Sequence, residues 1–259
     1  MKVPTQSRFV SSAIACLVFV AVSSQATLIQ IATSDGGGAD TYIQSTSGNV
    51  APFTNFGSTT GITLKNGGAA NQFARKGYLR FDLSSLSGPV DSAVLDLVVN
   101  SNDSGGGDPN PSSFTVEVFG LNDGAGDFWV EGNGGTDNNP LDEIVWSNAP
   151  GNDTASGIGL LGAQVTALGQ FGVTTSDIAG MTVQFASTPA FVNFINADSN
   201  GSASIILRRD SGGSNNLAFR TKEFGIASAP LLTLNAIPEP SSFSLVVLGL
   251  GFLLYRRRA

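Results

Sequence analysis

Histidine is absent from the 259 residues of this chain, and cysteine occurs once, as Cys16. Without histidine, Ser-His-Asp triads, histidine-ligated metals and imidazole general bases are all excluded. Cys16 lies in an apolar N-terminal run, so the rest of the chain has neither a thiol nucleophile nor an internal disulfide. The sequence also lacks Gly-Lys-Ser and Gly-Lys-Thr, which excludes the usual phosphate-binding loop.

Basic residues are scarce: 13 Lys and Arg stand against 20 Asp and Glu, which gives a formal net charge of −7. Apart from Lys2, Arg8 and three C-terminal arginines, eight basic residues remain in residues 27–236. Nineteen acidic residues remain there once Glu239 is set aside, so this part carries −11. Because phosphate binding needs clustered positive charge, no nucleic acid partner is expected. Neutral polysaccharide or divalent cations suit this surface better.

The N-terminus has the pattern of a signal peptide. Lys2 and Arg8 precede an apolar core over residues 13–22, and Ser24-Gln25-Ala26 offers the small residues that signal peptidase favours. We therefore expect a signal-peptide helix in residues 1–26, removed by signal peptidase. Residues 27–236 are long enough for one domain with a sizeable core.

The C-terminus, residues 237–259, has three parts. Pro238-Glu239-Pro240 is followed by an apolar segment over residues 243–255 and then by Arg256-Arg257-Arg258. The prolines favour an extended spacer, and the apolar segment is shorter than the roughly 20 residues of an ordinary spanning helix. The arginines would stay on the cytoplasmic side of a membrane.

This tail resembles the PEP-CTERM sorting signal of Gram-negative bacteria. The resemblance implies recognition by an exosortase-type membrane enzyme and transient anchoring in the inner membrane through a short transmembrane helix. It also implies delivery to the cell surface or to an extracellular exopolysaccharide matrix. An ordinary C-terminal membrane anchor is the alternative, and cleavage of the tail stays open.

Between these ends, short β-prone runs alternate with clusters of Gly, Ser, Asn and Asp. Strands are expected at residues 28–32, 40–44, 61–65, 77–82, 92–100, 114–119, 143–146, 164–166, 181–186, 203–208, 217–223 and 231–235. Only residues 189–196 look helical, with Thr188 as the cap and Pro189 in the first position. This pattern predicts an all-β fold, a jelly-roll-like β-sandwich.

Several of these segments carry a recognisable series of residues. They are Asp40-Thr41-Tyr42-Ile43, Leu79-Arg80-Phe81-Asp82-Leu83-Ser84, Val145-Trp146-Ser147-Asn148-Ala149-Pro150 and Phe219-Arg220-Thr221-Lys222-Glu223. Their order resembles the DNRLRE domain, which is related to disaggregatase repeats. The resemblance covers about Ile29 to Asn235, and it implies a polysaccharide-binding module of the kind found beside polysaccharide-degrading domains.

Glycan binding usually uses an exposed aromatic side chain with carboxylate, amide or guanidinium partners. Trp146 follows two aliphatic residues and is expected in the core, so Trp129, beside Phe128, is the candidate platform. Arg208 and Arg209 form one of two basic pairs in residues 27–236, and they could bind uronate carboxylates.

Two acidic, glycine-rich loops could bind calcium through carboxylate and carbonyl oxygens. One contains Asp123 and Asp127, and the other contains Asp103 and Asp108. Neither has EF-hand spacing, and a solvated turn is the alternative for each. Asp40 and Asp82 lie in strand segments, where capping a turn or pairing with Arg80 or Arg220 is the expected role.

The sequence therefore predicts an exported, non-catalytic surface or matrix protein that contacts extracellular polysaccharide. One alternative is a polysaccharide-degrading enzyme that uses a carboxylate pair, such as Glu131 with Glu143 or Asp142. Another is a purely structural or adhesive matrix protein without a specific ligand.

Overall fold

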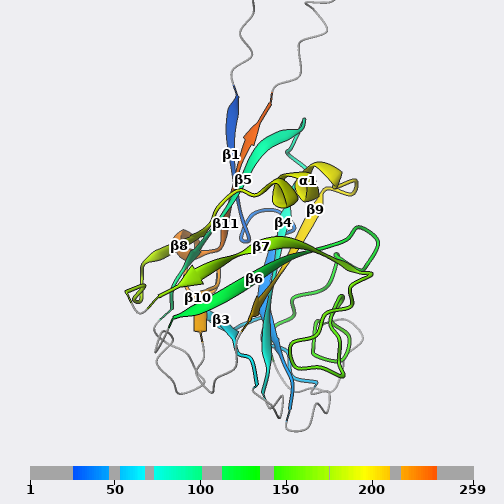
Figure 1. The fold of residues 1–259 in the computed structure, drawn as a ribbon, viewed down its shortest axis with the longest axis vertical. Helices are drawn as coiled ribbons and strands as arrows, with labels where there is room; N and C mark the ends of the chain where they lie inside the picture. Colours follow the sequence, from blue (N-terminus) through cyan, green and yellow to red (C-terminus); the bar gives the residue numbers. More distant parts are fainter. Residues whose placement is uncertain are drawn as a thin grey trace, which may run out of the picture.

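The computed structural model describes residues 26–46, 53–67, 73–100, 113–134, 143–174, 176–210 and 217–237. Nearly all regular structure in these ranges is β-strand (Figure 1). The strands are β1 (Thr27–Ala32), β2 (Ala39–Gln44), β3 (Gly61–Leu64), β4 (Arg75–Asp82), β5 (Val90–Val98), β6 (Phe114–Leu121), β7 (Val165–Val173), β8 (Thr182–Phe185), β9 (Ser202–Arg209), β10 (Leu217–Arg220) and β11 (Leu231–Ala236). Helix α1 (Pro189–Ala197) and the 3-10 helix η3 (Ile226–Ser228) complete the set.

The strands form two larger sheets and a two-stranded ribbon. One sheet has the order β2-β4-β9-β6-β7, the other β1-β11-β5-β8, and the ribbon pairs β10 with β3. All these pairings are antiparallel. The main hydrophobic core takes side chains from both larger sheets. The prediction of an all-β fold is therefore confirmed, and the layers are consistent with a β-sandwich; the jelly-roll connectivity stays a prediction.

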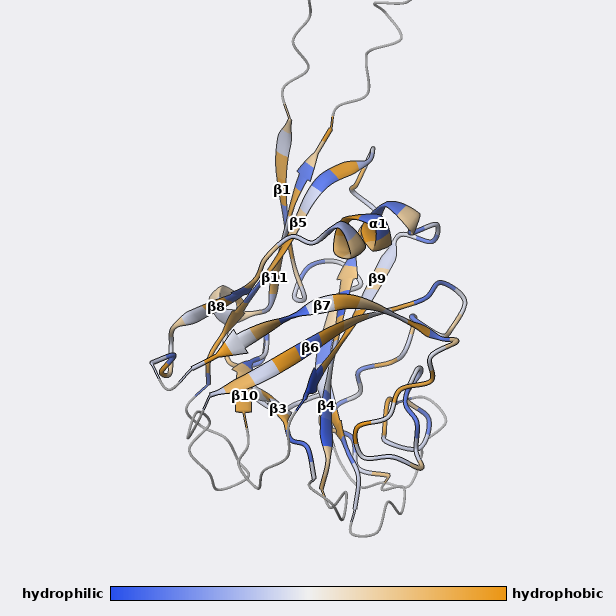
Figure 2. Cartoon of the chain, viewed as in Figure 1, coloured by the Kyte–Doolittle hydropathy of each residue, from blue (hydrophilic) through white to orange (hydrophobic). Residues whose placement is uncertain are grey.

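Period-two alternation builds the core. On β5 and just beyond it, Ala93, Leu95, Leu97 and Val99 are all fully buried, and the residues between them are partly exposed. Figure 2 shows a similar alternation of hydrophobic and more polar residues along β6.

The five-stranded sheet has a second covered face. Its outer side packs against the long connection between β6 and β7, which forms a separate hydrophobic cluster. From the sheet the cluster takes Ile43, Tyr78 and Ile206, and from the connection it takes Trp129 and Trp146. The predicted core position of Trp146 is confirmed, since its side chain is fully buried.

The predicted helix is also confirmed. α1 begins after Thr188, whose hydroxyl oxygen accepts a hydrogen bond from the Phe191 amide at 3.0 Å. The same hydroxyl donates to the carbonyl of Leu168 on β7 at 2.6 Å. Phe191 and Ile195 are buried, so this face of the helix joins the main core.

Two strand predictions need correction. The expected strand at residues 143–146 is irregular and leads into a turn at residues 146–148. In this turn Asn148 accepts from the Val145 amide at 2.8 Å, and the Ala149 amide bonds back to the Val145 carbonyl at 3.0 Å. The apolar residues of this segment are buried against the outer sheet face without joining a sheet. The strand expected at residues 164–166 is the beginning of the much longer β7.

The expected signal-peptide helix and the sorting tail lie outside the described residues. Within the described ranges, no helix is both long and apolar enough to cross a membrane. β1 and β11 pair along their whole length, with Thr27 opposite Ala236, so the first and last described strands lie side by side (Figure 1).

Candidate functional site

Trp129 is buried, so the expectation that it is exposed at the surface is wrong. Its side chain is 7 % exposed, and its ring meets Tyr78 edge-on with the centroids 6.0 Å apart. Its indole Nε1 donates to the hydroxyl of Ser204 on β9 at 3.1 Å, and that hydroxyl donates to the Asp127 carbonyl at 3.1 Å. These contacts fix the segment from Asp127 onward against the outer face of the five-stranded sheet.

The residues on either side of Trp129 in the chain have side chains that point to solvent. Phe128 is 65 % exposed and Val130 is 51 % exposed. The segment is held by the Ile144 amide, which donates to the Val130 carbonyl at 2.7 Å. Successive side chains therefore alternate between the protein interior and solvent, and the exposed aromatic side chain of this segment is Phe128.

A surface hollow of about 450 Å³ lies at this segment. Phe128, Trp129 and Glu131 line one part of it, and Arg80 and Asp82 at the end of β4 line another. The remaining lining comes from Gly37, Ser84, Val130 and residues 200–202. Concave sites with an apolar wall and a few fixed polar groups are the usual form of a ligand-binding site.

Arg80 is held in place by the protein on one side. Its Nε donates to the Gly37 carbonyl at 2.8 Å and its Nη1 donates to the Trp129 carbonyl. The guanidinium carbon lies 5.1 Å from the centre of the Trp129 ring, a favourable cation–π distance. Burial lowers the pKa of Arg80, and Glu131, Asp127 and Asp82 oppose that effect. The side chain is therefore a fixed cation at the wall of the hollow.

Asp82 presents a fixed anion beside Arg80. Its two carboxylate oxygens accept from the Gly37 amide at 2.8 Å and from the Ser84 amide at 3.0 Å. Hydrogen bonds from Ser84 and Gly37 lower its pKa, so the group stays ionised. The predicted turn-capping role of Asp82 is confirmed by the Ser84 contact.

Asp123 and Asp127 both bind the loop that leads into β9. Asp123 Oδ2 accepts from the amide and the hydroxyl of Ser199 at 2.8 and 2.6 Å. Asp127 Oδ2 accepts from the Asn200 side-chain amide at 2.8 Å. Asn200 lines the hollow and Ser199 does not, so the bond from Asn200 to Asp127 is the one that fixes a wall of it. Among the described residues, neither aspartate belongs to a group of three or more potential metal ligands, and calcium binding there stays a prediction.

Arg208 and Arg209 point to opposite faces of β9. Arg208 contacts Glu117, with Nη2 2.6 Å from Oε2, and its Nη1 donates to the Ile158 carbonyl at 2.7 Å. Arg209 is 4 % exposed, and its guanidinium carbon lies 3.7 Å from the centre of the Phe114 ring. The structure therefore does not bring the two arginines together, and neither lines the hollow beside Phe128.

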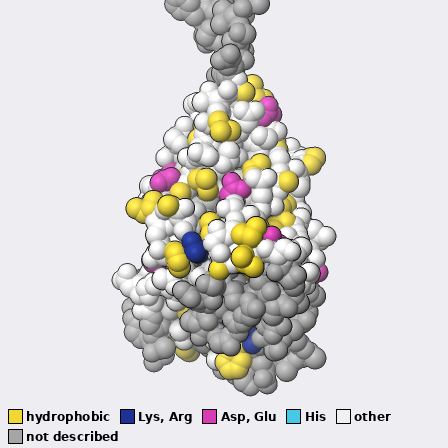
Figure 3. Space-filling view, turned by 90° about the vertical axis from the view of Figure 1, so that its left-hand side faces the viewer, with side chains coloured by type: hydrophobic (Ala, Val, Ile, Leu, Met, Phe, Trp, Pro, Cys, Tyr) yellow, Lys and Arg dark blue, Asp and Glu magenta, His cyan; other side chains and the backbone are white. Residues whose placement is uncertain are grey.

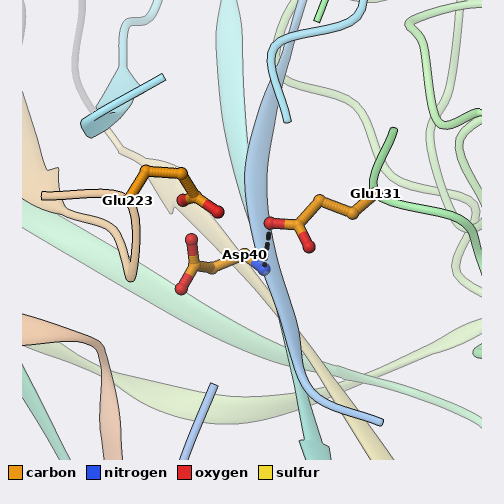
Figure 4. Close-up of side chains that lie close together, drawn as sticks. All are labelled: Asp40, Glu131 and Glu223. Atoms are coloured by element: carbon orange, nitrogen blue, oxygen red, sulfur yellow. Dashed lines mark hydrogen bonds between the residues drawn. The ribbon is translucent and has the colours of Figure 1, made fainter. Parts of the chain in front are cut away.

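Three acidic side chains meet near β2 (Figure 4). Asp40 lies between Glu131 and Glu223, and carboxylate oxygens of all three lie within 4.8 Å of one another. Glu131 Oε1 accepts from the Asp40 amide at 3.1 Å, and Oε2 contacts Lys222 Nζ. Asp40 accepts from the Thr33 hydroxyl and, at 3.1 Å, from the Lys222 amide. Asp40 pairs with neither Arg80 nor Arg220 among these contacts.

Burial affects the ionisation of two members of this cluster, Asp40 and Glu131. It raises the pKa of Asp40 to about 7; Glu223 and Glu131 add to the rise, whereas hydrogen bonds from Thr33 and Lys222 oppose it. Burial also raises the pKa of Glu131, against the bond and charge of Lys222. Because Lys222 supplies a cation and Thr33 and backbone amides supply donors, Asp40 and Glu131 belong to one hydrogen-bonded network.

The contacts of Glu131 do not match the role of a catalytic carboxylate that the enzyme alternative gives it. Glu131 lines the hollow, yet both of its oxygens have partners on the side of β2 and Lys222. Glu143 accepts from the Asn133 amide at 3.3 Å, and Asp142 lies outside the described residues. A catalytic acid must reach the bond that it cleaves, and Asp40 is fully buried.

A second part of the surface exposes hydrophobic side chains. Ile178, Met181, Phe224 and Ile226 are all exposed and lie next to β8 or η3 in the chain. Figure 3 shows that side of the molecule, where hydrophobic side chains stand among uncharged atoms with few charged groups. Arg220 covers one face of Phe224, with its guanidinium carbon 3.9 Å from the ring centre.

Several predicted site residues lie outside the described residues. They are the sorting-signal residues Pro238, Glu239, Pro240, Arg256, Arg257 and Arg258, and the calcium candidates Asp103 and Asp108.

Two features of the hollow were not predicted from the sequence. One is that Phe128 is the exposed ring, and the other is that Arg80 and Asp82 line the same hollow. The alternation of side chains along β4 could have indicated the second feature, because Arg80 and Asp82 are two residues apart and therefore lie on the same face of the strand. Nothing in the sequence indicated that the 128–131 segment would lie across that face.

Comparison with known families gives a match over the first part of the domain. The family described as Carbohydrate-binding module family 96 matches residues 36–167, about half of the chain. No curated protein matches the chain. Gly37, Arg80, Asp82, Ser84 and residues 128–131 all lie in the matched range, whereas residues 200–202 of the hollow do not.

Proposed function

The chain belongs to carbohydrate-binding module family 96, and we propose from this premise that the hollow beside Phe128 binds polysaccharide without cleaving it. The observation that carries the proposal is the coincidence of three features within the matched range. An exposed aromatic ring, a fixed carboxylate and a fixed guanidinium line one concavity. The surface near η3 offers an exposed ring at Phe224, but it lies outside the matched range.

Each group has a distinct role in this proposal. The ring of Phe128 offers an apolar surface on which the C–H face of a sugar packs. Asp82 accepts hydrogen bonds from sugar hydroxyls, and the guanidinium of Arg80 donates to ring or hydroxyl oxygens. Since the protein already holds both charged groups, little conformational entropy is lost when a glycan binds.

The non-catalytic part of the proposal rests on the acidic cluster. A glycosidase needs two carboxyl groups that flank the bond. Asp40 has the raised pKa that a general acid needs, but it is fully buried. Glu131 directs both oxygens into contacts with the Asp40 amide and Lys222. This arrangement favours binding over hydrolysis.

Retention and product release on a polysaccharide panel test the proposal. The purified protein is applied to insoluble polysaccharides with and without calcium, and soluble products are measured in parallel. We expect retention on at least one polymer and no product. Phe128→Ala removes the retention, whereas Phe224→Ala, which truncates an exposed ring that does not line the hollow, leaves it unchanged. Product release would establish the enzyme alternative, and failure to bind any polymer would favour the structural alternative.

We also propose that the protein is exported and sorted by its two ends. The signal-peptide pattern of residues 1–26 and the tripartite tail from Pro238 to Arg258 support this. The first and last strands pair with each other at one end of the domain, so attachment through the tail would leave the opposite end free. Signal peptidase and an exosortase-type enzyme are the processing partners in this proposal.

The mass of the mature protein tests export and sorting. The full chain is produced in a Gram-negative host that has an exosortase, and cell-surface and medium fractions are analysed by intact mass spectrometry. We expect a product that lacks residues 1–26 and the arginine cluster. Pro238→Ala with Pro240→Ala should leave the tail attached in the inner membrane. Correct processing of that variant would contradict the sorting proposal.

A further inference from the structure

A second hollow adjoins the one beside Phe128. It has a volume of about 460 Å³, close to the 450 Å³ of the first. Each value lies within the range of about 300–1,000 Å³ that is usual for ligand sites. The turn between β4 and β5 and the end of α1 line it, through Leu83, Leu86, Pro89 and Ile195 among others. Asn196, Asp198 and Ser199 also line it, so apolar and polar side chains alternate around this hollow.

The two hollows share a boundary. Ser84 and Gly201 line both of them. Gly201 has a φ of +78°, and an added Cβ would lie 3.7 Å from Ser84 Cα. Because Gly201 has no side chain and Ser84 has a short, exposed one, the boundary is low, and a bound chain can pass over it.

The second hollow is also preformed. Asp198 accepts from the Gly201 amide at 2.9 Å and from the Ser202 amide at 3.2 Å, which fixes the loop at the boundary. Asn196 exchanges hydrogen bonds of 2.8 and 2.9 Å with the backbone of Val90. The Ser199 hydroxyl donates to Asp123, so the solvent-exposed wall of the second hollow at Ser199 has a fixed position as well. The walls do not need to be ordered by a ligand.

We propose that the two hollows form one groove that binds an extended internal segment of a polysaccharide. This inference rests on the proposed function of the first hollow. In such a groove, sugar units in the second hollow add to the affinity of units in the first, because the second contact is intramolecular. Affinity therefore increases with the length of the glycan until both hollows are filled.

The test compares short and long oligosaccharides. Binding of the disaccharides and hexasaccharides of cellulose, mannan and polygalacturonate to the full chain is measured by isothermal titration calorimetry. For the polymer family that binds, we expect the hexasaccharide to bind at least roughly tenfold more tightly than the disaccharide, which is about 1.4 kcal/mol. The variant is Ser199→Trp, because Ser199 is exposed and lines only the second hollow.

Ser199→Trp should lower hexasaccharide affinity to that of the disaccharide and leave disaccharide affinity unchanged. Ser84→Trp, at the boundary, should weaken the hexasaccharide as well. The matched control is Ser85→Trp, because Ser85 is exposed and lines neither hollow. Equal affinity for both lengths, or an unchanged hexasaccharide affinity in Ser199→Trp, would overturn the inference but leave the proposed function standing. If the wild-type protein binds none of the probes and no polymer of the panel, both fail.

Discussion

Phe128 and Trp129 are consecutive residues whose rings lie on opposite sides of the same backbone segment. Phe128 is 65 % exposed, whereas Trp129 is 7 % exposed and packs against Tyr78. Trp129 anchors the segment to the sheet, and Phe128 is thereby held at the wall of the hollow. The two aromatic residues should therefore differ sharply in what their loss does to the protein.

Truncation of Trp129 should reduce stability. Trp129→Ala removes the contact with Tyr78 and the hydrogen bond to Ser204, and we expect the free energy of unfolding to fall by roughly 3–5 kcal/mol. Phe128→Ala should change it by less than about 0.5 kcal/mol, because the ring is exposed. Urea denaturation followed by tryptophan fluorescence and circular dichroism measures both. Equal losses for the two variants would contradict the assigned roles.

Lys76 should make stability rise with pH above neutrality. Its ammonium lies 4.6 Å from the centre of the Trp146 ring and donates to Asn152 and to the Gly159 carbonyl, each at 2.6 Å. Burial, followed by the charge of Arg208, lowers its pKa from 10.5 to about 7. Between these values the unfolded chain holds a proton that the folded chain has released, so stability rises with pH.

Lys76→Met should remove this rise, because it has no group to titrate. The measurement is the free energy of unfolding from about pH 7 to about pH 10 in both proteins. A slope that is the same in the variant and in the wild type would show that Lys76 titrates normally.

Asp40 should make stability fall as pH rises toward neutrality. Its pKa is raised from 3.8 to about 7 in the folded protein. Between these values the folded chain holds a proton that the unfolded chain has lost, so the stabilising contribution present below 3.8 disappears by about pH 7. Asp40→Asn keeps an oxygen for the Thr33 hydroxyl but has no titrating group, and it should be less sensitive to pH in this range. Thermal unfolding at a series of pH values provides the comparison.

Gly120 should not tolerate a side chain. A Cβ added there would overlap the ring of Phe194 on α1. We expect Gly120→Ala to lower the free energy of unfolding by roughly 1–3 kcal/mol, because α1 must shift. Gly172 on the neighbouring β7 is the control, since an added Cβ meets nothing within 4 Å. Gly172→Ala should leave chemical denaturation unchanged; similar losses in both variants would show that the contact with Phe194 is unimportant.

Local patterns predicted the parts of the fold that depend on a single segment. Alternation identified β5 and β6, and Thr188 with Pro189 identified α1. Residues 143–146 were wrongly expected to form a strand because Ile144, Val145 and Trp146 are buried, and burial under a loop produces the same apolar run. β7 was recognised only at its beginning, since Gly169 and Gly172 interrupt the β-prone pattern.

The site depends on contacts between distant segments, and these were harder to predict. Whether Phe128 or Trp129 faces solvent is decided by Ser204 and Tyr78, which lie on two strands far from both in the sequence. The hollow itself needs β4, the 128–131 segment and the loop before β9 together. A single sequence contains no signal for that assembly, although it did predict polysaccharide as the partner.

The location of the bound glycan tests the proposed binding site most directly. Two-dimensional amide NMR of the ¹⁵N-labelled protein, titrated with an oligosaccharide of the polymer that retains it, reports which residues the ligand contacts. We predict that the largest shifts occur at Gly37, Arg80, Asp82, Phe128 and residues 200–202. Shifts confined to Ile178, Met181, Phe224 and Ile226, which do not line the hollow, would contradict the assignment of the hollow as the binding site.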